Sequence, residues 1–99
     1  MTRLTIIALA GILTTGAAAA GPIETACARS ERGALNLPLC SCIQQVADVT
    51  LDGRDQRLAA RFFHDPHMAQ EVRQSDRSRD EVFWQRYRAF GSAAETYCN

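Results

Sequence analysis

The chain contains no lysine, so all of its basic residues are arginines. Several signatures of common activities are also missing: a glycine-rich phosphate loop, H-E-x-x-H, C-x-x-C and C-x-x-C-H. Alternating runs of β-branched residues are scarce, so little in the chain predicts β-strands. Basic and acidic residues balance at eleven each, whereas a general binder of nucleic acid or anionic membranes needs a basic excess. These absences argue against P-loop enzymes, zinc proteases, covalent haem proteins and nucleic-acid binders.

The first twenty residues have the features of a secretory signal peptide. Arg3 supplies one positive charge, an uncharged stretch follows, and residues 18–20 form an A-x-A cleavage site before Gly21. The apolar part is rich in threonine, glycine and alanine and is shorter than the roughly 20 residues of a membrane span. We therefore expect a cleaved signal peptide at 1–20 and one domain at 21–99, without a membrane span, in the periplasm or outside the cell.

The rest of the chain has helical periodicity with recognisable helix starts. Asp52 and Asp65 are expected N-caps, and Ser78 with Glu81 matches an S-x-x-E capping box. We expect a short turn or helix at 24–31 and helices at about 38–50, 52–63, 66–74 and 78–97. This pattern predicts a small all-α domain of about four helices.

Apolar residues recur every three or four positions and predict the core. The expected core positions are Leu39, Ile43, Val46, Thr50, Leu58, Ala59, Phe62, Phe63, Ala69, Val72, Phe83, Tyr87, Phe90, Ala94 and Tyr97. Gly91 interrupts the last series. Because the apolar rhythm continues beyond it, we expect the helix to continue as well, at a cost of about 1 kcal/mol relative to alanine.

Four cysteines, Cys27, Cys40, Cys42 and Cys98, predict two disulfides in an exported chain of this size. Cys40 and Cys42 would project about 200° apart on a helix, so a bond between them is the least expected pairing. We prefer Cys27–Cys40 with Cys42–Cys98 because the shorter loop closes more easily, and the crossed pairing stays open. A redox role for Cys-Ser-Cys is a weaker alternative, since a thioredoxin-like βαβ context is absent.

The only two histidines, His64 and His67, flank Asp65-Pro66. Two imidazoles and a carboxylate so close together are candidate ligands for zinc, copper or nickel. A third ligand from elsewhere is not identifiable, so we favour a solvated helix junction. We expect no cofactor and no metal, with a small metal carrier as an alternative.

An arginine-rich run near the C-terminus is a candidate anion-binding or partner-binding face. It contains Arg73, Arg77, Arg79, Arg86 and Arg88 among several acidic residues. Trp84, Arg86 and Arg88 are the candidate partner-binding residues, with Trp84 as an aromatic anchor. We expect Trp84 either to cover the Cys98 bridge or to stay partly exposed. The mixed charges favour an ordinary solvated helix surface.

Four motifs carry a resemblance: C-x-R-S-x-R-G from Cys27, C-x-C-I-Q from Cys40, F-F-x-D-P-H from Phe62 and W-x-R-Y-x-A-F-G from Trp84. Together they resemble a functionally uncharacterised group of small exported bacterial proteins with four cysteines. Some of that group carry the label "arginine transporter", which would imply at most an accessory role in arginine transport. A chain with no membrane span cannot itself be a transporter.

No Ser-His-acid set is recognisable, and so small a helical domain offers little room for a deep active site. We therefore expect a soluble, non-enzymatic interaction or accessory protein of the cell envelope. Its expected partner is another envelope protein of unknown identity.

Overall fold

The computed structural model describes residues 20–98, so the expected signal peptide lies outside the described residues except for Ala20. Within that range the chain forms helices and no strands, which confirms the all-α class. The six helices are α1 (Pro22–Arg29), α2 (Glu31–Ala34), α3 (Leu37–Thr50), α4 (Gly53–Arg61), α5 (Pro66–Arg73) and α6 (Ser78–Tyr97). The segment around Cys27, where one short turn or helix was expected, forms two helices.

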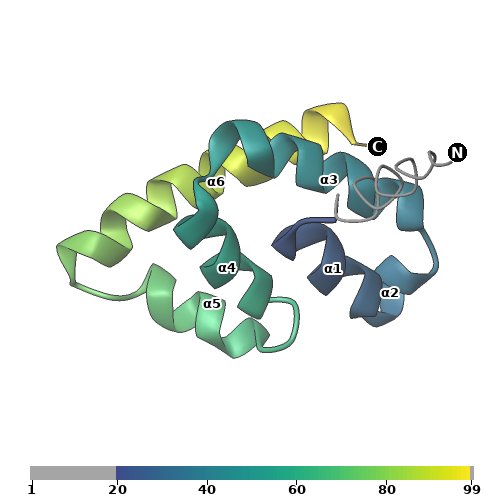
Figure 1. Ribbon diagram of the computed structural model, residues 1–99. Helices are drawn as coiled ribbons and strands as arrows, with labels where there is room; N and C mark the ends of the chain where they lie inside the picture. Colours follow the sequence, from purple (N-terminus) through teal and green to yellow (C-terminus); the bar gives the residue numbers. More distant parts are fainter. Residues whose placement is uncertain (1–19, 99) are drawn as a thin grey trace, which may run out of the picture.

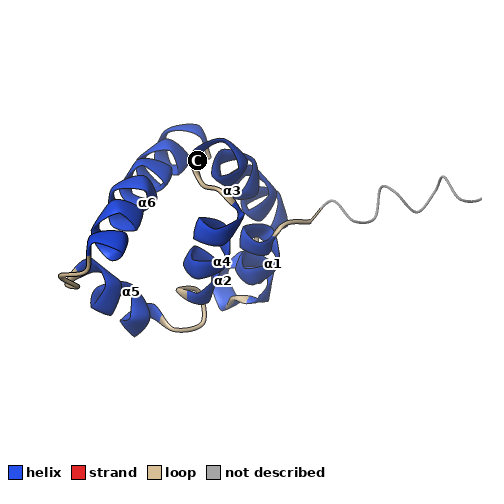
Figure 2. Cartoon of the chain, turned by 60° about the vertical axis from the view of Figure 1, so that its left-hand side comes forward, coloured by secondary structure: helices blue, strands red, loops and turns tan. Residues whose placement is uncertain are grey.

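The helices form two tiers (Figure 1). α3 and α6 cross the top of the molecule in this view, and α1, α2, α4 and α5 lie below them. α3 packs against α1 and α6, and α1 also packs against α4. α5 packs against α6, and the turned view shows α5 beside the start of that helix (Figure 2). α3 therefore joins the N-terminal helices to the long C-terminal one.

Aromatic rings fill the core between α4 and α6. The buried apolar cluster consists of Ile23, Ala47, Leu51, Ala59, Phe62, Phe83 and Phe90. The ring of Phe62 meets Phe83 and Tyr87 edge-on, with centroids 6.1 and 5.3 Å apart. The predicted α6 series is confirmed as far as Phe90. It is wrong at Tyr97, which is 75% exposed because a disulfide at the next residue, and not an apolar contact, holds this end of α6 against α3.

The buried face of α3 is centred one residue away from the predicted stripe. Cys40, Gln44 and Ala47 are buried, whereas Ile43 and Val46 are half-buried at its flank. One residue corresponds to a rotation of about 100°. α3 turns this way because α1 covers one side of it and α6 another. A polar side chain, Gln44, therefore occupies a position that apolar periodicity cannot identify.

Two buried glutamines connect three helices. The Gln44 side-chain oxygen accepts a 2.8 Å hydrogen bond from the backbone N–H of Glu24, in the first turn of α1. Its Nε2 donates to Oε1 of Gln56, also at 2.8 Å. Nε2 of Gln56 in turn donates to the carbonyl oxygens of Ala47 and Leu51 at the end of α3, at 3.3 and 3.1 Å. The pair thus satisfies helix-end groups that no local side chain reaches.

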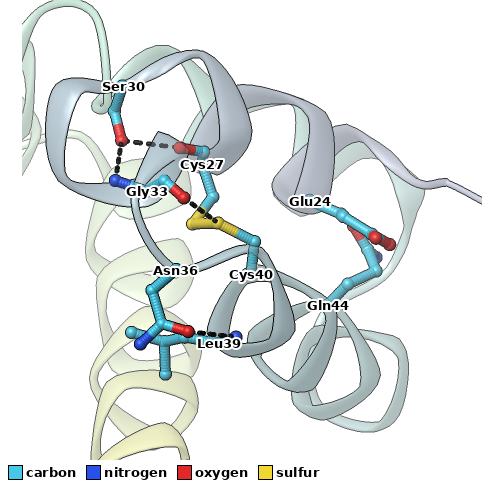
Figure 3. The surroundings of a disulfide bond; sticks show 8 residues. All are labelled: Glu24, Cys27, Ser30, Gly33, Asn36, Leu39, Cys40 and Gln44. Carbon is cyan, nitrogen blue, oxygen red and sulfur yellow. Dashed lines mark hydrogen bonds between the residues drawn. A yellow bond between two sulfur atoms is a disulfide. The ribbon is translucent and has the colours of Figure 1, made fainter.

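The preferred disulfide pairing is confirmed. Cys27 bonds to Cys40 and Cys42 to Cys98, with Cα–Cα distances of 5.5 and 5.8 Å. Figure 3 shows the first bridge beside Ser30 and Gly33. Ser30 Oγ donates to the Cys27 carbonyl at 2.6 Å and accepts from Gly33 N–H at 3.1 Å. A Cβ on Gly33 would lie 1.7 Å from that carbonyl oxygen, so only glycine fits this close approach.

The predicted helix caps have mixed outcomes. Asp52 and Asp65 cap α4 and α5 as expected, accepting from the N–H groups three residues on. The capping box at Ser78 is wrong: Ser78 is already helical, and the N-cap is Arg77, which makes no side-chain cap hydrogen bond. Ser75 fixes the turn instead, because its hydroxyl accepts from the Arg77 N–H at 3.1 Å. α6 continues through Gly91 as predicted.

None of the helices between residues 20 and 98 combines the length and the hydropathy needed to cross a bilayer.

Candidate functional site: an arginine-lined pocket

Five arginines surround a pocket between α4 and the start of α6. Arg54, Arg57 and Arg61 lie three and four residues apart, so they share one face of α4. They span about 10 Å along the helix axis. Arg77 is the N-cap residue of α6, and Arg79 lies in its first turn. The pocket volume is about 630 Å³. Figure 2 shows the backbones of α4 and of the first half of α6 facing each other.

The pocket combines a positive rim with apolar side chains. Leu58 and Phe83 contribute the apolar part of the lining, and Asp80 is its single acidic residue. Five positive charges against one negative leave a local excess of +4, although the whole chain is balanced. Apolar surface beside charged groups lowers the local dielectric constant and strengthens their attraction for an anion.

Intramolecular ion pairs do not occupy these arginines. Within residues 20–98, none of the five guanidinium groups makes an ion pair or a side-chain hydrogen bond. Arg86 shows the contrast. Its Nε and Nη2 donate to the two carboxylate oxygens of buried Asp55 at 2.5 and 2.9 Å. That hydrogen bond raises the pKa of Arg86 above its ordinary value.

The start of α6 adds to the positive potential. Its first-turn N–H groups carry the positive end of the helix dipole, which the first-turn acids Asp80 and Glu81 partly offset. No side chain caps this end, because Arg77 stands at the N-cap position. The dipole end and two of the guanidinium groups therefore lie at the same side of the pocket.

The structure separates the predicted partner-binding residues. Arg86 is held by Asp55, and Arg88 lies in an exposed hollow of α6 with Gln85, away from the five arginines. Trp84 is half-buried and packs against Tyr87 at a centroid distance of 5.1 Å. Cys98 is fourteen residues further along the same helix, or about 21 Å. Trp84 therefore does not cover that bridge, and the expectation of partial exposure is the one confirmed.

The histidines are not assembled into a metal site in the described structure. His64 is exposed after α4, and His67 lies on α5 with Nε2 3.7 Å from a carboxylate oxygen of Glu71. Between residues 20 and 98, no group of three or more His, Cys, Asp or Glu side chains is placed to hold a metal ion. The metal-carrier hypothesis gains no support from this arrangement.

The spacing of the α4 arginines is a sequence signal for the pocket. Closeness along the chain instead groups the arginines from Arg73 to Arg88. Two of that run, Arg77 and Arg79, do line the pocket. The other three lie on α4, where a spacing of three and four residues marks a common face.

Comparison with protein-family models, curated proteins and solved structures finds no match to this chain. The resemblance to small exported four-cysteine proteins stays a prediction.

Proposed function

We propose that the protein is a non-enzymatic accessory protein of the bacterial cell envelope, and that it works by binding an anionic partner in the arginine-lined pocket. The observation that carries this proposal is the set of five guanidinium groups without an intramolecular partner around one pocket. Arginine keeps its charge in proteins and binds carboxylate and phosphate groups in a planar, bidentate geometry.

The chemistry of the lining supports binding over catalysis. Arginine cannot accept a proton, so five of the eight lining residues cannot serve as a general base. Leu58 and Phe83 are chemically inert, and Asp80 alone does not make a catalytic set. The two disulfides support an oxidising location such as the periplasm.

The same charges argue against a carrier of free arginine. Free arginine is cationic overall, because its one carboxylate is offset by its ammonium group, and its guanidinium would lie close to five others with only Asp80 in the lining to compensate. Like charges held together destabilise a complex. An accessory role in arginine transport would therefore have to use another surface.

Titration with an anion tests the proposal directly. The arginine Nε–Hε signals of the folded protein are followed by NMR while sodium sulfate is added at constant ionic strength. We expect saturable shifts of the signals from Arg57, Arg77 and their pocket neighbours, and no comparable shift for Arg32 on α2. The double variant Arg57→Gln/Arg77→Gln should abolish saturation. Uniform shifts of all arginine signals, or none, would overturn the proposal.

A further inference from the structure

We infer that the pocket takes a short chain of linked phosphoryl groups, a diphosphate or triphosphate, lying along α4 and reaching the start of α6. This inference rests on the proposed anion-binding function and names its ligand class. It follows from three properties of the pocket: the length of its arginine row, its charge excess, and the presence of cationic groups on both walls.

The length of the arginine row favours an elongated ligand over a compact one. Arg54 and Arg61 lie about 10 Å apart along the axis of α4. Orthophosphate contacts both only if the two side chains bend toward each other along the helix. An elongated anion lying parallel to α4 contacts the whole row, with Arg57 at its middle. The pocket volume of about 630 Å³ is also typical of small-molecule sites and exceeds what a single inorganic anion fills.

The charge excess sets how many anionic groups the ligand needs. The lining carries five positive charges and one negative charge. One phosphoryl group carries about −1.5 to −2 at pH 7, so it neutralises at most half of the excess of +4. Two or three linked groups match it.

An acidic peptide does not supply the same charge density. In an extended peptide, side chains on one face recur every second residue, about 6.6 Å apart. A segment 10 Å long then presents only two carboxylates to the arginines of α4, each with a single charge. Neighbouring phosphoryl groups share a bridging oxygen, so their negative charges are more closely spaced than those of the peptide. Their anionic oxygens also point outward on all sides of the chain.

The two walls of the pocket allow the ligand to be held from opposite sides. Arg57 comes from α4, and Arg79 comes from the first turn of α6. The N–H end of α6 is itself suited to a phosphoryl oxygen. A chain that lies between these walls can accept hydrogen bonds from both, which a one-sided surface patch cannot provide.

Isothermal titration calorimetry with sodium orthophosphate, pyrophosphate and tripolyphosphate tests the inference, at constant ionic strength and without divalent cations. We expect affinity to rise with each added phosphoryl group, and tripolyphosphate to bind at least 100-fold more tightly than orthophosphate. Hexaglutamate is the peptide control and should bind more weakly than tripolyphosphate. ATP separates the possible sources: equal affinity indicates a free phosphate chain, and affinity at least tenfold higher indicates a nucleotide.

Matched variants locate the binding. Arg57→Gln and Arg79→Gln should each weaken tripolyphosphate binding at least tenfold, because each removes charge-assisted hydrogen bonds from one wall. Arg32→Gln makes the same charge change on α2, which packs against α1 and α3, and should alter the affinity less than twofold. All three positions are exposed, and unchanged circular dichroism will establish that the variants fold.

The outcomes separate this inference from the proposed function. Saturable sulfate binding with equal affinities for orthophosphate and tripolyphosphate would overturn the phosphoryl-chain inference and leave an anion pocket. Tighter binding of hexaglutamate would overturn it in favour of an acidic protein segment. Equal losses in Arg57→Gln and Arg32→Gln would show that binding follows overall charge, and would overturn both proposals.

Discussion

Loss of the Arg86 side chain should destabilise the fold by about 2 kcal/mol. Arg86 holds the carboxylate of Asp55 through two hydrogen bonds, and the Asp55 side chain is only 6% exposed. Removing one partner of a buried ion pair costs about 3–5 kcal/mol. The Arg86 side chain is 43% exposed, so water can partly solvate the orphaned carboxylate, and we reduce the expected loss to about 2 kcal/mol.

Arg86→Met is the appropriate change, because methionine keeps the apolar stem and removes only the charged end. Urea unfolding followed by circular dichroism, with the disulfides oxidised, gives the free energy of unfolding. Arg88→Met, two residues along the same helix and exposed, is the control and should change it by less than about 0.5 kcal/mol. Asp55→Asn and the double variant complete a cycle, in which we expect a coupling energy of about 1–2 kcal/mol.

A stabilising role for the Arg86–Asp55 pair would be refuted if Arg86→Met were no more destabilising than Arg88→Met. A coupling energy near zero in the cycle would refute that role as well. Either result would mean that water compensates the carboxylate fully, and that aromatic packing alone joins α4 to α6.

Three further predictions concern α6. Gly91→Ala should raise the free energy of unfolding by about 0.8–1 kcal/mol, because alanine favours the helix and a Cβ at this position meets no atom within 4 Å. Urea unfolding measures this change, and a decrease would show that a Cβ does not fit there. Burial raises the pKa of Tyr87, so in a Tyr97→Phe background absorbance at 295 nm should show its phenol ionising above the ordinary value of about 10. The folded state favours the protonated phenol, so this contribution to stability is complete below about pH 10 and is lost as the pH rises through the folded pKa; ionisation at the ordinary value with the fold intact would contradict it. The double variant Cys42→Ala/Cys98→Ala removes a disulfide of sequence separation 56 and should lower the free energy of unfolding by about 4 kcal/mol, because the unfolded chain regains the entropy of an open loop. A decrease below about 1 kcal/mol in thermal or urea unfolding would exclude this explanation.

Local chemistry made much of the fold predictable. In the caps at Asp52 and Asp65, the aspartate side chain accepts a hydrogen bond from an N–H group only three residues further on. Both partners lie in one short stretch of sequence, so these caps could be predicted. The divergence of Cys40 and Cys42 on a helix argued against a bond between them, and loop length gave only a preference between the two pairings that remained. At Ser78 the same kind of argument failed, because the S-x-x-E pattern does not show whether the helix begins before or after the serine.

The long-range polar contacts could not be predicted in the same way. Gln44 and Gln56 are buried only because their amides reach helix ends on other elements. Asp55 is an acid in the first turn of α4, and its ion-pair partner Arg86 is thirty-one residues away. A single sequence contains no periodic pattern for such pairs. The contact between α4 and the start of α6 is also long-range. The spacing of the arginines therefore predicts a common face on α4, but it does not predict the pocket that this face forms with α6.

The positions of the two disulfides along the chain have a consequence for biosynthesis. In the proposed export, the chain enters the oxidising compartment from its N-terminus, so Cys27 and Cys40 arrive close together, whereas the partner of Cys42 follows 56 residues later. Until Cys98 arrives, an oxidant finds three cysteines competing for one bond. The separation of 13 residues between Cys27 and Cys40 closes more easily than the separation of 56 between Cys42 and Cys98, so the first native bridge can form before the second is possible.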